Sequence, residues 1–481
     1  MKRELGSFER ALVISDRHAP FHIVNVLRLE NAPPPQILRQ SLKVLQNHHP
    51  FLSARLVSEN GRYYFASLAN PGLPFHVLPR WNDGHWMQVA EVELGTRMDV
   101  ATGPLFRCTY LYDAAKGHSD IILSLFHAIT DASSAAQLMH ELLNACASFM
   151  DEKTVTVYEL PPSPPVESRF PSAFRGVRLA FQAFRFALRQ TSDEIAYRRK
   201  TRGKRIPPVH KNPVHGRILS MGLTEEMTES LASRARREKV TLNSALNAAM
   251  LLALNRRLYA GQQVPMRTFS FADLRPYINP PLEVENLACY ISMLRYTVAV
   301  EGGLEFWDLA RDLHEKIYSS LKSGDKFVAS KMAEPLMKRV TRLKTFRMAA
   351  TALNYNGLIP IQPGYGRIKV SGLHGFVSVF DLGPEFSAEA HIFNDRLHWD
   401  FMYLDADMSR DEARAIVEEI KSILQSAIRE GTGLGTTQPR SPTPARGAKE
   451  SPGKTLPVKI DQTEPPEKTR PINTDQADSS R

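Results

Sequence analysis

Two positions in the chain place an aspartate four residues after a histidine. His127 is followed by Asp131, and His391 is followed by Asp395. A neutral imidazole can take the proton from an alcohol, amine or thiol as that group attacks a thioester, which contributes roughly 10²–10⁴-fold to the rate. Because chance produces such a spacing in a chain of this length, the surrounding elements must separate the two pairs.

The position of His127 at the end of a strand distinguishes it from His391. Residues 120–126 form an apolar run that predicts a strand, and residues 133–143 predict a helix. His127 therefore lies where a strand opens through a short loop into a helix, a place where side chains project into clefts. His391 lies inside an alternating strand with its aspartate in the next turn, which needs no functional explanation. The alternative for His127 is a hydrogen-bonded histidine of the core.

The first half of the chain contains the elements that position His127. Residues 36–45 have the period of an amphipathic helix, and residues 49–57 predict the start of a strand. Residues 107–112 and 120–126 flank a turn-rich stretch, so we expect a β-hairpin. The prolines of residues 160–165 predict a stiff, extended linker and hence a domain boundary.

The second half restarts an alternation of strands and helices, which indicates an α/β protein. Helices are predicted at 224–237 and 241–258, and strands at 218–221, 265–271, 293–300, 350–355, 375–380, 387–393 and 396–403. Asn394 and Asp395 fit the turn of a final hairpin. The spacing of Ser409 and Glu412 predicts a capping box that begins the last helix. From Gly433 onward the composition predicts disorder.

The amino-acid composition limits which classes of function the protein can have. The hydrophobic fraction of 43% predicts a folded core, and the net charge of +10 favours acidic partners. Cys108, Cys146 and Cys289 lie far apart, which predicts buried thiols, no disulfide framework and no zinc site. No apolar stretch follows residues 1–10, and no window has the ~18 apolar residues of a spanning helix. We therefore expect a soluble, cytoplasmic protein.

Several segments, in order, resemble motifs of one enzyme superfamily. Residues 125–131, followed by a helix of small residues, resemble the HHxxxD(G) region of the chloramphenicol acetyltransferase superfamily. This superfamily includes condensation domains, alcohol acyltransferases and mycobacterial polyketide-associated acyltransferases. Further similar segments are 47–55 (HPxLR), 103–107 (xPLxR), 271–276 (VDLRxR), 286–293 (GNxxxx) and 354–357 (SNxG). The resemblance spans roughly residues 5–430, and the ordered set is more specific than any single motif.

The resemblance implies an α/β fold of two acetyltransferase-like subdomains. Each would be a mixed sheet with flanking helices, and the two would form a V-shaped pseudo-dimer around a central tunnel. We expect an N-terminal subdomain at 1–160, a linker with a basic amphipathic crossover at 161–215, and a C-terminal subdomain at 216–432. Residues 433–481 would form the tail.

The resemblance also assigns roles to residues of the histidine loop. It implies that His127 is the general base and that Asp131 is structural, paired with Arg275. Two positions depart from the family pattern, since Phe126 replaces the first histidine and Ala132 replaces the glycine after the aspartate. Neither change removes the base, but both leave the identity of the substrate open.

Four further residues are candidates for substrate binding. Asn354 and Tyr355 lie in the segment that resembles SNxG, and Asn354 could donate to the oxyanion of a tetrahedral intermediate. A backbone amide is the alternative donor. Thr130 and Ser133 flank the histidine and could line the tunnel, although capping of the following helix explains them equally well.

The resemblance implies acyl transfer from a thioester to an alcohol or amine by direct attack, without a covalent enzyme intermediate. Acyl-coenzyme A or an acyl-carrier protein would be a substrate, and no metal or prosthetic group is expected. The protein would act as a monomer in natural-product biosynthesis. The alternative is a catalytically silent, condensation-like protein that binds a carrier protein or a membrane.

The basic stretch at 169–205 permits three interpretations. Phe170, Phe174, Val177, Phe181, Phe184 and Leu188 recur at helical spacing among several arginines. The stretch could rest on an anionic membrane or gather a lipid-like acyl chain, dock an acidic carrier protein, or form an interdomain helix with a solvated basic face. Nucleic acid is not expected, because no known binding module accompanies the charge.

Overall fold

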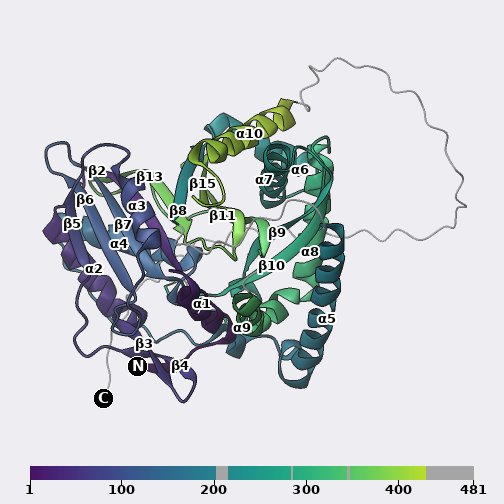
Figure 1. The fold of residues 1–481 in the computed structure, drawn as a ribbon. Coiled ribbons are helices and arrows are strands. Elements are labelled where there is room, and N and C mark those ends of the chain that lie inside the picture. Colours follow the sequence, from purple (N-terminus) through teal and green to yellow (C-terminus); the bar gives the residue numbers. More distant parts are fainter. Residues whose placement is uncertain (202–214, 283–284, 344–346, 430–481) are drawn as a thin grey trace, which may run out of the picture. The chain divides into compact units, whose positions relative to one another are not determined.

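The computed structural model describes residues 1–201, 215–282, 285–343 and 347–429, which fall within one compact unit. Two six-stranded sheets and one three-stranded sheet form its framework (Figure 1). No helix within the described ranges is long and apolar enough to span a membrane. The tail expected from Gly433 onward lies outside the described residues.

The first large sheet contains the strand that leads to His127. Its order is β12-β13-β2-β7-β6-β5, and β7 pairs antiparallel with both β2 and β6. The strands are β2 His22–Glu30, β5 Phe75–Pro79, β6 Phe106–Asp113, β7 His118–Phe126, β12 Gly364–Tyr365 and β13 Ile368–Val377. The hairpin expected from residues 107–112 and 120–126 is therefore confirmed.

Helices cover both faces of this sheet, as its alternating apolar residues require. Val24, Val26 and Ile122 pack against Trp86 of α3, whereas Leu123 on the opposite face belongs to the core beneath α2 and α4. The helices are α2 Pro35–His48, α3 His85–Gly95 and α4 Ala132–Met150.

The second large sheet has the order β10-β9-β11-β14-β15-β8. Its strands are β8 Gly216–Gly222, β9 Val264–Asp273, β10 Ile291–Val300, β11 Ala349–Leu358, β14 Pro384–Phe393 and β15 Arg396–Leu404. The helices of its core are α6 Glu225–Arg237, α7 Leu242–Leu258, α8 Phe306–Ser323 and α10 Arg410–Arg429. Residues 244–255 of α7 are all buried, as the apolar run at 241–258 predicts.

Two strands of the C-terminal half, β12 and β13, belong to the first sheet. The strand expected at 375–380 is β13, which ends at Val377 and pairs antiparallel with β2 (Figure 1). The continuous C-terminal subdomain expected at 216–432 is therefore wrong for residues 364–377. Alternation in a strand identifies its two faces, but it carries no information about which strand lies beside it.

Local signals place most of the turns and caps. Asn394 and Asp395 both have positive φ, at 50° and 61°, so the final hairpin has the turn that the sequence predicts. Ser409 and Glu412 hydrogen bond to each other's backbone amides, which confirms the capping box. Residues 50–53 form the 3₁₀ helix η1 rather than the start of a strand, and β3 begins at Ala54.

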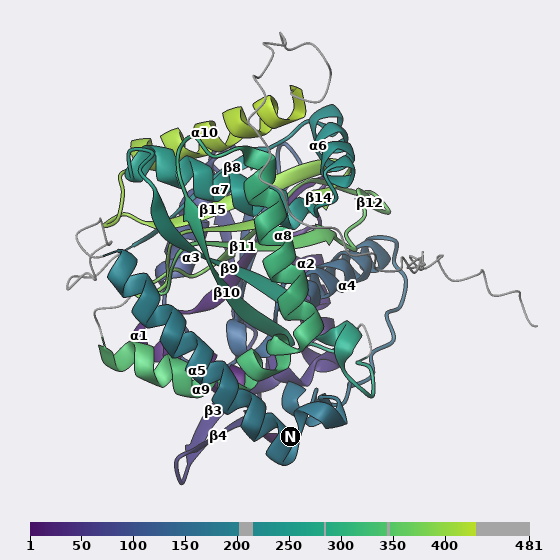
Figure 2. The same ribbon diagram turned by 90° about the vertical axis from the view of Figure 1, so that its right-hand side faces the viewer.

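Three further helices and a small sheet complete the described fold. The small sheet has the order β1-β4-β3, and Figure 2 shows α5 beside α9. These elements are β1 Lys2–Glu4, β3 Ala54–Glu59, β4 Arg62–Ser67, α1 Ser7–His18, α5 Gly176–Lys200 and α9 Asp325–Leu343.

Candidate active site

The histidine loop is anchored in the core on both sides of His127. β7 ends at Phe126, and the short 3₁₀ helix η2 (His127–Ile129) follows. Phe126, Ala128 and Ile129 are fully buried. Phe126, which occupies the position of the family's first histidine, is thus a core residue that holds the loop in place.

Hydrogen bonding determines the tautomer of His127. Its Nδ1 lies 3.0 Å from the carbonyl oxygen of Thr130. Because a carbonyl only accepts, Nδ1 carries the proton and Nε2 is left with a lone pair. The ring of Phe21 stacks on the imidazole with centroids 5.5 Å apart. Burial lowers the pKa of His127 below its usual value, so the neutral form, which can act as a base, is favoured.

Asp131 begins helix α4 and binds Arg275. Its carboxylate caps the helix by accepting from the Ser134 amide at 3.0 Å, and it also accepts from the Tyr290 amide at 2.8 Å. Arg275 donates to both oxygens, at 2.9 and 3.0 Å, which is a bidentate pair. The same guanidinium donates to Asp273 at the end of β9. This network joins the histidine loop to the second sheet.

His127 lies in the wall of a cavity of about 920 Å³. Its lining includes residues of both large sheets and of α1, α5 and α9. Of the residues expected to bind substrate, Ser133, Asn354 and Tyr355 line this cavity. Thr130 does not: it is fully buried, and its hydroxyl donates to the Asp131 carbonyl. The expectation that Thr130 lines the tunnel is therefore wrong, because the extended backbone after η2 turns its side chain into the protein.

The Asn354 amide is already engaged inside the cavity. Its Nδ2 donates to Glu389 Oε2 at 2.9 Å, and Asn356 Nδ2 donates to the same oxygen at 3.0 Å. Since an amide nitrogen carries two hydrogens, Asn354 retains one further donor.

No cysteine near the loop is an activated nucleophile. Cys289 Sγ lies 3.9 Å from His127 Nδ1, but burial raises the pKa of its thiol well above the usual value. Burial also raises the pKa of Cys146, to about 12. Both groups are therefore thiols at neutral pH, and a buried thiol is a poor nucleophile.

The sequence did not single out three polar residues that lie near Asn354. Glu389 and His374 line the cavity, and Asp400 is buried beside them. Polar residues alternate along β14 at 385, 387, 389 and 391. That alternation was the available signal, because a buried sheet face rarely carries successive polar residues without a ligand or a network.

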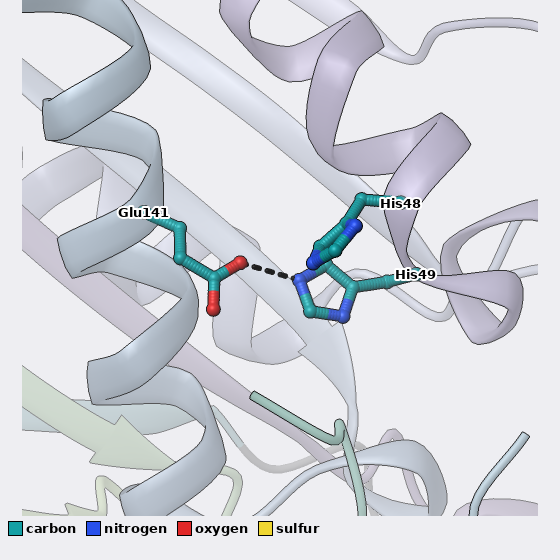
Figure 3. Close-up of side chains that lie close together, drawn as sticks. All are labelled: His48, His49 and Glu141. Carbon is teal, nitrogen blue, oxygen red and sulfur yellow. Dashed lines mark hydrogen bonds and ion pairs between the residues drawn. The ribbon is translucent and has the colours of Figure 1, made fainter. Parts of the chain in front are cut away.

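One group within the described ranges has the residue types of a metal site. His48, His49 and Glu141 place their ligand atoms within 4.8 Å of one another. Figure 3 shows the three side chains at the junction of α2 and α4, with a hydrogen bond of 2.7 Å between His49 Nε2 and Glu141 Oε2. His48 Nδ1 donates to the Tyr158 carbonyl at 2.6 Å. The His49–Glu141 bond joins the end of α2 to α4, and the His48 bond ties the same end of α2 to the segment after α4. The cluster is not part of the cavity lining.

Comparison with known proteins shows which sequences this chain resembles. Residues 213–390 match a family model described as the C-terminus of phthiocerol/phthiodiolone dimycocerosyl transferase. The enzyme of that name from Mycobacterium leprae is 24% identical over 298 residues, which cover 60% of this chain and 66% of that protein. One component of the linear gramicidin synthase of Brevibacillus parabrevis is 24% identical over 233 residues, covering 46% of this chain and 3% of that protein.

Solved structures match over most of the chain. Trichothecene 15-O-acetyltransferase of Fusarium sporotrichioides superposes with a TM-score of 0.71 at 12% identity, covering 89% of this chain and 95% of that chain. Polyketide synthase associated protein 5 of Mycobacterium tuberculosis gives a TM-score of 0.65 at 17% identity, covering 89% and 98%. The chain has the chloramphenicol acetyltransferase-like fold.

The expected resemblance is therefore confirmed, and so is the α/β fold of two mixed sheets with flanking helices. The chain is related to acyltransferases. Its fold is also similar to that of polyketide synthase associated protein 5 and of a condensation domain. It spans less than two thirds of the length of the two curated relatives that it matches.

Proposed function

We propose that the chain moves an acyl group from a thioester to an alcohol or amine, with His127 as the general base. The observation that carries this proposal is the Nε2 lone pair of His127 in the wall of a large cavity, with Nδ1 held by the Thr130 carbonyl. A base must present an unprotonated atom to the nucleophile, and this arrangement supplies one.

The proposed step proceeds without a covalent enzyme intermediate. The acceptor oxygen or nitrogen attacks the thioester carbonyl carbon, and its proton passes to His127 Nε2. The tetrahedral intermediate then expels the thiolate, the carbon–sulfur bond breaks, and the imidazolium returns the proton to sulfur. The remaining N–H of Asn354 is the proposed donor to the oxyanion. Asp131 and Arg275 hold the loop and take no part in proton transfer.

Coenzyme A or the phosphopantetheine arm of a carrier protein is the proposed thiol of the donor. No metal or prosthetic group enters this step, because attack, proton transfer and collapse require only a base and a hydrogen-bond donor. We test the proposal with acetyl-, octanoyl- and hexadecanoyl-coenzyme A, each offered 1-octanol and octylamine. Mass spectrometry should detect an ester or amide with release of free thiol. If no pair yields a product above the rate without protein, acyl transfer to small acceptors is wrong.

We further propose that α5 contacts an anionic membrane surface. Its apolar residues divide into two faces, since Leu179 and Phe186 are buried whereas the opposite side chains are exposed: Val177 by 86%, Phe181 by 61%, Phe184 by 62% and Leu188 by 55%. Arg178 and Arg185 lie along one edge of this exposed stripe. An apolar stripe beside a basic edge is typical of helices that lie in a membrane interface.

A further inference from the structure

A row of polar side chains crosses the second sheet at one level. Asn354 of β11 is paired with Glu389 of β14, Glu389 with Asp400 of β15, and Asp400 with Ser220 of β8. Residues directly opposite each other in neighbouring strands point to the same face of a sheet. The row therefore places four polar groups side by side on one face.

That face is the one that borders the cavity. Asn354 and Glu389 line the cavity, as does His391, two residues further along β14. The residues of the opposite face, such as Ala390 and Trp399, belong to the apolar core that contains α7 and α10. The polar row thus lies outside the apolar core, in the wall of the space that His127 also reaches.

Glu389 has one oxygen available on this face. Its Oε2 accepts from Asn354 and Asn356, whereas Oε1 has no hydrogen bond to any residue that the structure describes. The side chain is partly exposed within the cavity. Burial, reinforced by the nearby Asp400, raises the pKa of Glu389 to about 8, so its carboxyl group is largely protonated at neutral pH and can donate as well as accept.

His374 reaches the same region from β13 of the first sheet. Its Nδ1 lies 2.9 Å from Asp400 Oδ1, and the carboxylate is held by the Ser220 hydroxyl at 2.7 Å and the Gly375 amide at 2.9 Å. Trp86 stacks on the imidazole with centroids 4.2 Å apart. Because Asp400 accepts from Nδ1, a proton resides there, and in the neutral imidazole Nε2 keeps a lone pair. Among the described residues Nε2 has no partner, and His374 lines the cavity.

We propose that Glu389 and His374 form a polar subsite that binds a hydroxyl group of the substrate, remote from the carbonyl that reacts at His127. A hydroxyl donates one hydrogen bond and accepts others, so it can donate to His374 Nε2 while it accepts from the Glu389 carboxyl. An anionic group would meet Asp400 and is disfavoured. The subsite rests on the proposed function, because it recognises a second part of the same substrate.

The hydroxyl belongs either to the acceptor or to the acyl chain, and matched probes separate these sources. For the acceptor, kcat/KM is measured with 1,8-octanediol and 1-octanol, using octanoyl-coenzyme A as the donor. For the acyl chain, 8-hydroxyoctanoyl-coenzyme A is compared with octanoyl-coenzyme A, using 1-octanol as the acceptor. The same comparisons with the corresponding twelve-carbon probes test a longer reach. In at least one pair, the hydroxylated probe should be favoured by about tenfold, as expected for one or two hydrogen bonds.

Variants then assign the preference to the subsite. Glu389→Leu and His374→Phe should each reduce it to about twofold or less, because two equivalent hydroxyls give a statistical factor of two, while Glu389→Gln should retain most of it. His398→Phe is the matched control, since His398 stacks on His391 in the same sheet but does not line the cavity. This control should keep the preference. Circular dichroism checks that each variant is folded.

Three outcomes would overturn the subsite. They are the absence of a preference in every probe pair, a preference that survives in both Glu389→Leu and His374→Phe, and a stronger preference for 8-amino-1-octanol than for the diol. Ligand-observed NMR of 1,8-octanediol against 1-octanol measures binding without turnover. If wild-type protein shows no transfer yet binds the diol more tightly through Glu389 and His374, the proposed function fails and the subsite stands. If wild-type protein catalyses transfer but shows no preference for the diol in rate or in binding, the subsite fails and the proposed function stands.

Discussion

Replacement of Arg275 by methionine should destabilise the protein far more than the loss of an ordinary surface ion pair. Arg275 is bidentate to Asp131, whose side chain is only 1% exposed. In Arg275→Met the Asp131 carboxylate keeps the amides of Ser134 and Tyr290 but loses its counter-charge in a buried site. Removing one partner of a buried pair typically costs about 3–5 kcal/mol, because the remaining charge is left uncompensated.

The assay is urea denaturation followed by circular dichroism, with the free energy of unfolding compared at equal slope. Lys2→Met is the control, since Lys2 and Glu59 are 53% and 47% exposed and such pairs contribute about 0–1 kcal/mol. Arg275→Lys should lie between the two, because lysine keeps the charge but cannot form the bidentate pair. In the double variant with Asp131→Asn, the total loss should be smaller than the sum of the single losses.

The account of the loop would be refuted if Arg275→Met cost no more than Lys2→Met, or if the effects of the Arg275 and Asp131 changes were additive. Either result would mean that the pair does not act as a buried unit. Because the same pair positions the strand-to-helix loop, Arg275→Met should also lower kcat/KM of any transfer reaction while the folded fraction stays high. That loss should be smaller than the loss in His127→Ala.

Three further predictions follow from burial and exposure. Since burial lowers the pKa of His127, the acid limb of its pH–rate profile should lie below pH 6.5, and an inflection above that value would contradict the assignment. Burial lowers the pKa of His22 to about 4, so the stability that the neutral side chain contributes is complete above pH 6.5 and is lost as the pH falls to 4. In His22→Gln, the difference between the free energies of unfolding at pH 6.5 and pH 4, measured by urea denaturation, should be smaller by about 3 kcal/mol. The same difference in the variant and in wild-type protein would contradict this prediction. Replacing Phe181 and Phe184 by serine should reduce co-sedimentation with phosphatidylserine vesicles at least severalfold, whereas unchanged binding would exclude α5 as the contact.

Much of the site could be predicted because its signals are local. The helix expected at 133–143 is α4, because helix formation depends on consecutive residues. Its N-cap is Asp131, whereas the sequence suggested Thr130 or Ser133 for that role. The pairing of Asp131 with Arg275 joins residues far apart in the chain, and only the resemblance to a known family suggested it. Phe126 shows that a local signal can also differ from the family pattern. Its apolar side chain predicts burial, which the structure confirms, although the family has histidine at this position.

Long-range contacts account for what the sequence did not reveal. The partner of β13 could not be read from its residues, because a strand that crosses to the other sheet has the same alternation as one that does not. His391, considered alone, is an ordinary strand residue, but the same strand carries Glu389. Glu389 lies beside Asn354 and Asp400 only because β14 pairs with both β11 and β15. His374 joins this group from the first sheet, 26 positions before Asp400. Such a cluster is determined by the register between paired strands, so no single segment of the sequence reveals it.

The most direct test of the central claim is the rate of acyl transfer by His127→Ala. It is compared with wild-type protein and with His118→Ala, a control at the other end of β7. With octanoyl-coenzyme A and the best acceptor of the panel, kcat/KM should fall by about 10²–10⁴-fold in His127→Ala and stay within about twofold in His118→Ala. Transfer by folded His127→Ala at the wild-type rate would show that His127 is not the base.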